Sequence, residues 1–127
     1  MAPIITVENL NKSFRDVKAL NNLSFAVEAG NCYGFLGPNG AGKSTAMKII
    51  YGKCTRDENP QTKVNVFGYD PAKDELSIKF LSGVVQQEDN LDDELNVFQN
   101  LRIYSKFYNI KASDARERIE YLLEFFE

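Results

Sequence analysis

The feature that most constrains this chain is a glycine-rich stretch, Gly37–Ser44, which matches the pattern G-x-x-x-x-G-K-[ST]. An apolar run, Cys32–Leu36, precedes it, and a helix-like pattern, Ser44–Tyr51, follows it. A strand, a loop and a helix in this order surround an anion with the backbone N–H groups of the loop and of the helix N-terminus. We therefore predict a phosphate-binding turn between a buried strand and a helix that stops at Gly52.

The residue types in this stretch suit the phosphates and the metal ion of a nucleotide. Glycine permits positive φ and a close approach of the backbone to phosphate oxygens. The Lys43 ammonium would contact the β- and γ-phosphates, the Ser44 hydroxyl would bind Mg²⁺, and Thr45 would hydrogen-bond the α-phosphate. A glycine-rich turn without a ligand is the alternative that this context disfavours. The residues expected to bind MgATP form the phosphate loop: Gly37, Pro38, Asn39, Gly40, Ala41, Gly42, Lys43, Ser44 and Thr45.

Length, charge and residue content exclude several classes of protein. The 127 residues suit one domain. The net charge of −3 argues against a broad basic surface, so we expect no nucleic-acid partner. The chain has no histidine, which excludes histidine acid–base catalysis and histidine metal ligands. It also has no apolar stretch of about 18 residues and no secretory leader, and its two cysteines have no metal-ligand spacing, so we expect a cytosolic location.

Hydrophobic patterning predicts further elements on both sides of the phosphate loop. The expected strands are Ile4–Leu10, Leu20–Glu28 and 64–67, with loops over Asn11–Val17 and Lys53–Lys63, and the expected helices are Pro71–Phe80, Glu94–Tyr108 and a last helix with Ser113 as its N-cap. Tyr121 and Phe125 make the end of that last helix apolar nearly all round. We therefore expect the natural chain to continue beyond Glu127.

The phosphate loop, GPNGAGKST, resembles the Walker A motif of the ATP-binding subunits of ABC transporters. Residues 5–45 resemble the first segment of these subunits, and residues 81–110 resemble their glutamine-containing segment. The likeness is strongest to exporters of the drug-resistance and nodulation-factor type. It implies an α/β P-loop NTPase with a mainly parallel sheet and an antiparallel β subdomain. It also implies that residues 1–127 are the truncated, N-terminal part of a single ATP-binding domain.

The resemblance assigns roles to residues outside the phosphate loop. Phe14 matches the aromatic residue that stacks on adenine, with a role in the core as the alternative, and Ala19 matches a small residue near the ribose. Gln87 matches the glutamine that approaches Mg²⁺ and the attacking water. Because the usual Pro-Gln is Gln86-Gln87 here, Gln86 remains an alternative. The implied catalytic residues are thus Lys43 and Gln87, and the implied Mg²⁺ ligands are Ser44 and Gln87.

Several motifs of the family do not occur in this sequence. Leu81-Ser82-Gly83 is followed by valine and precedes the glutamines, so it is a false match to the LSGG signature. No apolar run ends in an Asp-Glu pair, and no switch histidine exists. The loop over Lys53–Lys63 is longer than usual and lacks the usual glycine. We therefore predict that these 127 residues bind ATP but do not hydrolyse it alone, whereas the full-length protein is an ATP hydrolase.

The resemblance implies a transport function with several partners. The subunit would couple MgATP binding and hydrolysis to solute export through a separate membrane permease, and would dimerise with a second ATP-binding subunit. It would be cytoplasmic and peripheral on the inner face of the plasma membrane. A small P-loop kinase or GTPase is a weaker hypothesis, since no Asn-Lys-x-Asp motif is present. A non-catalytic nucleotide-binding or assembly module and a non-transport ABC ATPase are further alternatives.

Overall fold

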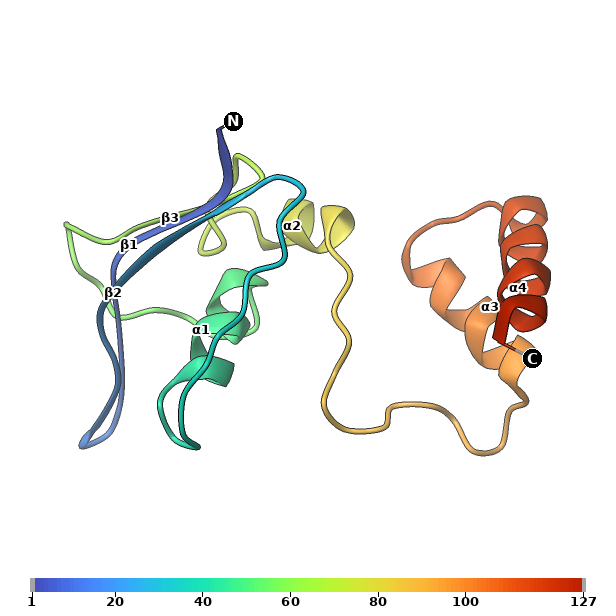
Figure 1. Cartoon of the computed structure of the whole chain (residues 1–127), viewed down its shortest axis with the longest axis horizontal. Helices are drawn as coiled ribbons and strands as arrows, with labels where there is room; N and C mark the ends of the chain where they lie inside the picture. Colours follow the sequence, from blue (N-terminus) through green and yellow to red (C-terminus); the bar gives the residue numbers. More distant parts are fainter. Residues whose placement is uncertain (1, 127) are drawn as a thin grey trace. The chain divides into compact units, whose positions relative to one another are not determined.

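The computed structural model describes residues 2–126, which fall into two compact units divided between Gly83 and Val84. The described part of the first unit contains three strands and two helices, and that of the second contains two helices (Figure 1). The phosphate loop and the strands before it all belong to the first unit.

The first unit is built on an antiparallel sheet with the strand order β2-β1-β3. Strands β1 (Pro3–Phe14) and β2 (Val17–Glu28) form a long hairpin, and β3 (Lys63–Val66) pairs with the first half of β1. The prediction of a strand over 64–67 is confirmed except at Phe67, whose φ of 54° takes the chain out of the strand.

The hairpin strands are longer than the sequence predicts. The prediction of a loop over Asn11–Val17 is wrong, because β1 continues to Phe14 and β2 begins at Val17. The turn is confined to Arg15 and Asp16. These polar residues form strands because their backbones pair across the hairpin, with Phe14 opposite Val17, so that backbone N–H and C=O groups are satisfied despite the lack of apolar alternation.

The segment Cys32–Leu36 departs furthest from the sequence analysis, which predicts a buried strand in a mainly parallel sheet. In the structure this segment is irregular and mostly exposed, and the strand pairs among residues 2–126 are antiparallel. A strand needs a neighbouring backbone to share hydrogen bonds, and no strand within the described residues runs beside this segment. Its apolar side chains contact β2 instead: the rings of Tyr33 and Phe35 lie 5.5 and 5.1 Å from that of Phe25.

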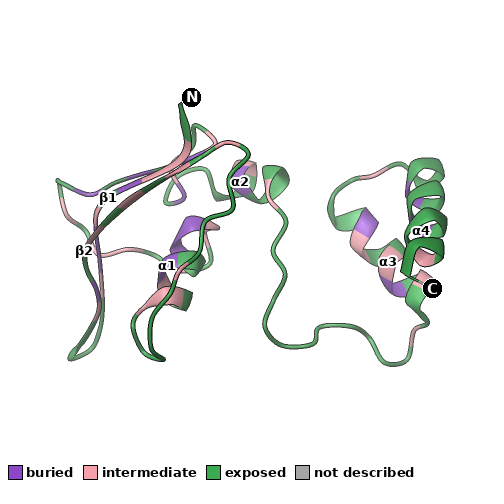
Figure 2. Ribbon diagram, in the orientation of Figure 1, coloured by how far each residue is buried: buried purple, intermediate pink, exposed green. Residues whose placement is uncertain are grey.

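Helix α1 (Lys43–Ile50) lies on the inner side of the bent hairpin (Figure 1). It matches the predicted helix to within one residue at each end. Gly52, with a φ of 78°, follows the helix and donates its N–H to the Ile49 carbonyl at 3.1 Å, which confirms the predicted stop. The buried residues of α1, Ala46, Ile49 and Ile50, pack into the core that this helix shares with the strands, and Figure 2 shows buried stretches on both β1 and α1.

Helix α2 (Glu75–Leu81) is shorter than the predicted helix over Pro71–Phe80. Residues 71–73 form a turn instead, in which the Asp70 carbonyl accepts the N–H groups of Lys73 and Asp74 at 2.9 Å each. The core of the first unit joins the sheet to both helices and comprises Val7, Leu10, Leu20, Ala46, Ile49, Ile50, Val64, Val66 and Ile78.

The second unit contains helices α3 (Val97–Phe107) and α4 (Ala112–Phe126). Asn96 begins α3 with a capping box: its side chain accepts the Gln99 N–H at 2.9 Å, and the Gln99 side chain accepts the Asn96 N–H at 2.9 Å. The prediction that Ser113 is the N-cap of the last helix is wrong, because α4 already begins at Ala112. Ser113 therefore lies inside the first turn, where its hydroxyl contacts the Asp114 carboxylate.

The exposed side of α4 carries three large aromatic side chains. Tyr121, Phe125 and Phe126 are 63%, 68% and 79% exposed. This agrees with the apolar end predicted for this helix. Across residues 2–126, no helix combines the length and the apolar character needed to cross a membrane.

Candidate nucleotide-binding site

The phosphate loop follows the irregular segment Cys32–Leu36, forms a tight turn, and leads into α1 at Lys43. The Ala41 N–H donates to the Pro38 carbonyl at 3.2 Å, which closes the turn. Gly40 and Gly42 have φ values of 85° and 87°. Side chains with a Cβ rarely adopt these angles, so the glycines of the motif determine the path of the loop.

Gly42 packs directly against the backbone of β2. A Cβ at this position would overlap the Ala19 carbonyl oxygen and would lie 2.7 Å from Cδ2 of Leu20. A Cβ at Gly40 would meet nothing within 4 Å. The structure therefore brings Ala19, which the resemblance places near the ribose, against the phosphate loop.

The N-terminus of α1 leaves backbone donors free at the end of the loop. The first hydrogen bond of the helix joins the Ala46 N–H to the Gly42 carbonyl at 2.9 Å. The N–H groups of Lys43, Ser44 and Thr45 come before this bond and have no carbonyl one turn back, and Gly42 supplies no side-chain cap. Together with the helix dipole, these donors form a site that suits an anion.

Lys43 folds back over the phosphate loop. Its Nζ donates to the carbonyls of Gly37 at 2.5 Å and Pro38 at 2.7 Å. A positive charge thus lies over the same turn as the free N–H groups. Ser44, the expected Mg²⁺ ligand, is exposed one residue further along α1. This donor set suits the phosphates and the metal ion of a nucleotide, with a hard oxygen ligand for Mg²⁺.

Phe14 lies at the end of the hairpin and is 48% exposed. The Lys12 Nζ lies 5.1 Å from the centroid of the Phe14 ring, in the geometry of a cation–π contact. Lys12 is not predicted from the sequence, although residues i and i+2 of a strand share one face, and this spacing could have indicated it. Half of the Phe14 surface remains exposed, which leaves room for a base to stack, and that role stays a prediction.

Gln86 and Gln87 lie in the second unit, in the irregular segment before α3, and both are exposed. Their assignment to Mg²⁺ and the attacking water therefore stays a prediction. Among residues 2–126, no cluster of three or more acidic, cysteine or histidine side chains has the arrangement of a metal site.

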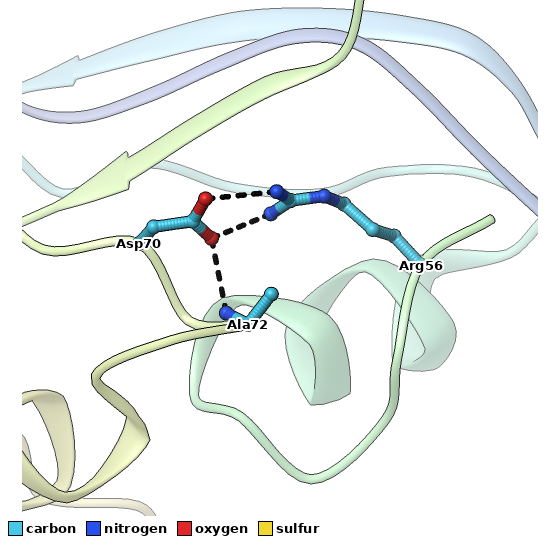
Figure 3. Close-up of polar contacts among 3 residues, drawn as sticks. All are labelled: Arg56, Asp70 and Ala72. Atoms are coloured by element: carbon cyan, nitrogen blue, oxygen red, sulfur yellow. Dashed lines mark hydrogen bonds and ion pairs between the residues drawn. The ribbon is translucent and has the colours of Figure 1, made fainter. Parts of the chain in front are cut away.

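The structure also contains an ion pair that the sequence analysis missed. Arg56 donates two parallel hydrogen bonds to the Asp70 carboxylate at 2.7 and 2.8 Å, and the Ala72 N–H donates to the same carboxylate at 3.0 Å (Figure 3). The Arg56 guanidinium holds the pKa of Asp70 below its usual value, against a smaller opposing effect of burial. The pair connects the long loop after α1 to the turn before α2, and no sequence motif links residues so far apart.

Comparison with solved structures defines the class of fold. An ATP-binding subunit of an ABC transporter matches with a TM-score of 0.80 over 95% of this chain and 49% of that chain, at 24% identity, a likeness that shows the fold alone. An ATP-binding cassette of an ABC transporter matches with a TM-score of 0.76 over 98% of this chain and 54% of that chain, at 30% identity. The fold is therefore that of a P-loop NTPase, which confirms the predicted class.

Comparison with sequences identifies the family. The family model described as ABC transporter matches residues 20–127. "Nod factor export ATP-binding protein I" of Rhizobium sp. (strain N33) is 41% identical over 95% of this chain and 39% of its own length. The protein of the same name from Ralstonia nicotianae is 36% identical over 97% of this chain and 37% of its own length. This chain belongs to the ABC transporter family, and it spans about two fifths of the length of these curated relatives.

Proposed function

We propose that this chain binds MgATP as the N-terminal part of a single ATP-binding domain in an ABC transporter subunit. The observation that carries the proposal is the arrangement at the phosphate loop. The loop backbone packs on β2 at Gly42, the first N–H groups of α1 have no partner in the helix, and Lys43 covers the turn. These groups form one anion site in a chain whose family consists of ATP-binding proteins.

Each residue of the site has a proposed role. Lys43 neutralises the β- and γ-phosphates, while the loop from Gly37 to Gly42 surrounds the phosphate chain with N–H groups. Ser44 offers its hydroxyl to Mg²⁺, whose charge offsets that of the phosphates, and Thr45 donates to the α-phosphate. Phe14 provides a stacking surface for adenine, and Ala19 leaves space for the ribose.

The partners follow from the family and from the relatives that are named as export proteins. We propose that the whole subunit couples ATP binding and hydrolysis to solute export through a separate membrane permease. It would pair with a second ATP-binding subunit and lie on the cytoplasmic face of the plasma membrane, without a nucleic-acid partner. Within this assembly Gln87, with Gln86 as the alternative, would approach Mg²⁺ and orient the attacking water.

The proposal is tested by equilibrium titration of this chain with MgATP. The wild-type chain is expected to bind saturably, and Lys43→Ala is expected to weaken binding by at least about tenfold, because it removes a charge-assisted contact worth roughly 1.5–3 kcal/mol. Lys48→Ala is the matched control, because Lys48 is an exposed lysine on the same helix. Equal affinity of the wild type and Lys43→Ala would overturn the proposal.

A second measurement tests whether this chain hydrolyses ATP. We propose that it does not, because the sequence contains no signature motif and no Asp-Glu strand end to complete the site around the γ-phosphate. Phosphate release should match that of a sample without protein. Release that disappears in Lys43→Ala would contradict this part of the proposal.

A further inference from the structure

The β1–β2 hairpin contains two opposed irregularities near its middle. Val7 pairs with Phe25 and Leu10 with Leu23, so β1 has one residue more than β2 between these pairs. Leu10 pairs with Leu23 and Lys12 with Leu20, so β2 has one residue more in the next interval. Each strand therefore contains a β-bulge, and the two bulges follow each other directly.

An asparagine in the left-handed region lies in each bulge: Asn9 has a φ of 50° and Asn22 a φ of 49°. Asparagine accepts this conformation more readily than most residues with a side chain. Bulges increase the twist of a strand pair and bend it locally. Two adjacent bulges on opposite strands therefore account for the change of direction in the hairpin that Figure 1 shows.

Asn11 connects the two bulges through its side chain. Its Nδ2 donates to the Asn9 carbonyl at 2.8 Å and to the Asn22 Oδ1 at 2.9 Å, and its Oδ1 accepts the Asn22 N–H at 3.0 Å. Asn11 is only 7% exposed, which makes these bonds costly to break. Thr62 strengthens the Asn9 side, since its hydroxyl donates to the Asn9 carbonyl at 2.6 Å.

The part of the hairpin beyond the bulges, residues 12–20, is the part that reaches the candidate site. We call it the outer arm. The outer arm includes Ala19 and Leu20, whose atoms lie nearest to the position of a Cβ on Gly42 of the phosphate loop. Its other strand ends at Phe14, beside the hairpin turn. The outer arm contains one further register shift, at Ala19, because Lys12 pairs with Leu20 and Ser13 with Lys18. The direction in which the outer arm leaves the two bulges, together with this shift, determines where its end at Phe14 lies.

We propose that Asn11 and Asn22 are positioning residues for the base of the bound nucleotide: their hydrogen bonds hold the outer arm at the angle that presents Phe14 to the base. This inference rests on the proposed function, because it takes MgATP as the ligand and Phe14 as the stacking residue. Neither asparagine contacts the nucleotide. Their effect should be larger on the base than on the phosphates, because the phosphate contacts come from the loop and from α1.

The first test compares two ligands, MgATP and magnesium tripolyphosphate, which has the phosphates but no base. Asn22→Gly keeps the positive φ accessible while it removes the oxygen that accepts from Asn11. We expect it to lower the affinity for MgATP by about fivefold and to change that for tripolyphosphate by less than about twofold, since stacking affects only the base. Asn22→Asp retains the acceptor and should bind MgATP within about twofold of the wild type. Asn22 is exposed, so these variants should fold.

The second test is a double-mutant cycle with Phe14→Ala. If Asn22 acts through Phe14, the variant Phe14→Ala/Asn22→Gly should bind MgATP no more weakly than Phe14→Ala alone. Additive losses, equal losses for both ligands, or unchanged MgATP affinity in Asn22→Gly would each overturn the inference and leave the proposed function intact. A wild-type chain that binds neither ligand would overturn both.

Discussion

Gly42 lies so close to Ala19 that the carbonyl oxygen of Ala19 occupies the space where a Cβ on Gly42 would be. The contact joins residues that are far apart in the sequence and belong to the phosphate loop and to β2. The phosphate loop and β2 are therefore closely packed at this point. A glycine is required here both for its φ of 87° and for the absence of a side chain.

Substitution of Gly42 should therefore lower the free energy of unfolding more than substitution of Gly40. Gly42→Ala is expected to lower the free energy of unfolding by about 2–4 kcal/mol, because left-handed backbone strain adds to the overlap with β2. Gly40→Ala has similar strain but open space around it, and should cost about 1 kcal/mol. Urea denaturation of the two variants measures the difference. Equal costs would contradict the close packing on Ala19.

The core of the first unit depends on Leu10, which is fully buried between the sheet and the helices. Leu10→Ala is expected to destabilise the chain by about 2–5 kcal/mol, because it removes apolar burial and leaves a cavity. Leu36→Ala is the matched control, since Leu36 is 96% exposed, and should change stability by less than about 0.5 kcal/mol. Denaturant midpoints provide the comparison, and a similar loss in both variants would be evidence against this core.

The Arg56–Asp70 pair should make stability depend on pH. The pKa of Asp70 is lowered from 3.8 in the folded chain. The ionised carboxylate therefore contributes its full stabilisation of the fold above pH 3.8, and this stabilisation is lost as the pH falls through the lower pKa of the folded chain. Asp70→Asn should cost about 1 kcal/mol at neutral pH, and this difference should shrink in strong acid. Glu8→Gln is the control, because the exposed Glu8–Lys63 pair is 4.0 Å long. A loss in Asp70→Asn that is the same at every pH would exclude an ionic contribution.

The capping box at Asn96 should stabilise α3. Asn96→Ala removes the acceptor for the Gln99 N–H and should cost about 1 kcal/mol. Ser113→Ala should change stability by only a few tenths of a kcal/mol, because Ser113 lies within the first turn of α4 and does not cap it. Circular dichroism during urea denaturation can follow both variants. A loss of stability in Ser113→Ala larger than that in Asn96→Ala would indicate that Ser113 caps α4 after all.

The phosphate loop was predictable because its geometry is local. Nine consecutive residues carry the glycines, the lysine and the start of α1, and their φ preferences and free N–H groups need no distant partner. The stop at Gly52 and the apolar face of α1 follow from the same short-range physics. The family resemblance, which the comparisons confirm, also rested on contiguous stretches of sequence, residues 5–45 and 81–110.

The extent and shape of the strands depended on partners elsewhere in the chain. The strands extend to Phe14 and from Val17 because the two backbones pair across the hairpin. Their bulges are held by Asn11, which no hydrophobic pattern marks. Cys32–Leu36 has the composition of a buried strand but no strand beside it within the described residues. Arg56 and Asp70 meet only because two loops approach each other.

The sequence by itself therefore determined the phosphate loop, the approximate positions of the helices and the family. Only the tertiary structure decided where the strands end, how the hairpin bends toward the phosphate loop, and which distant charges pair. The physical reason is the range of the interactions. Helix turns and glycine conformations are set by neighbours within about four residues, whereas strand pairing, bulges and ion pairs form only once the fold has brought distant backbones and side chains together.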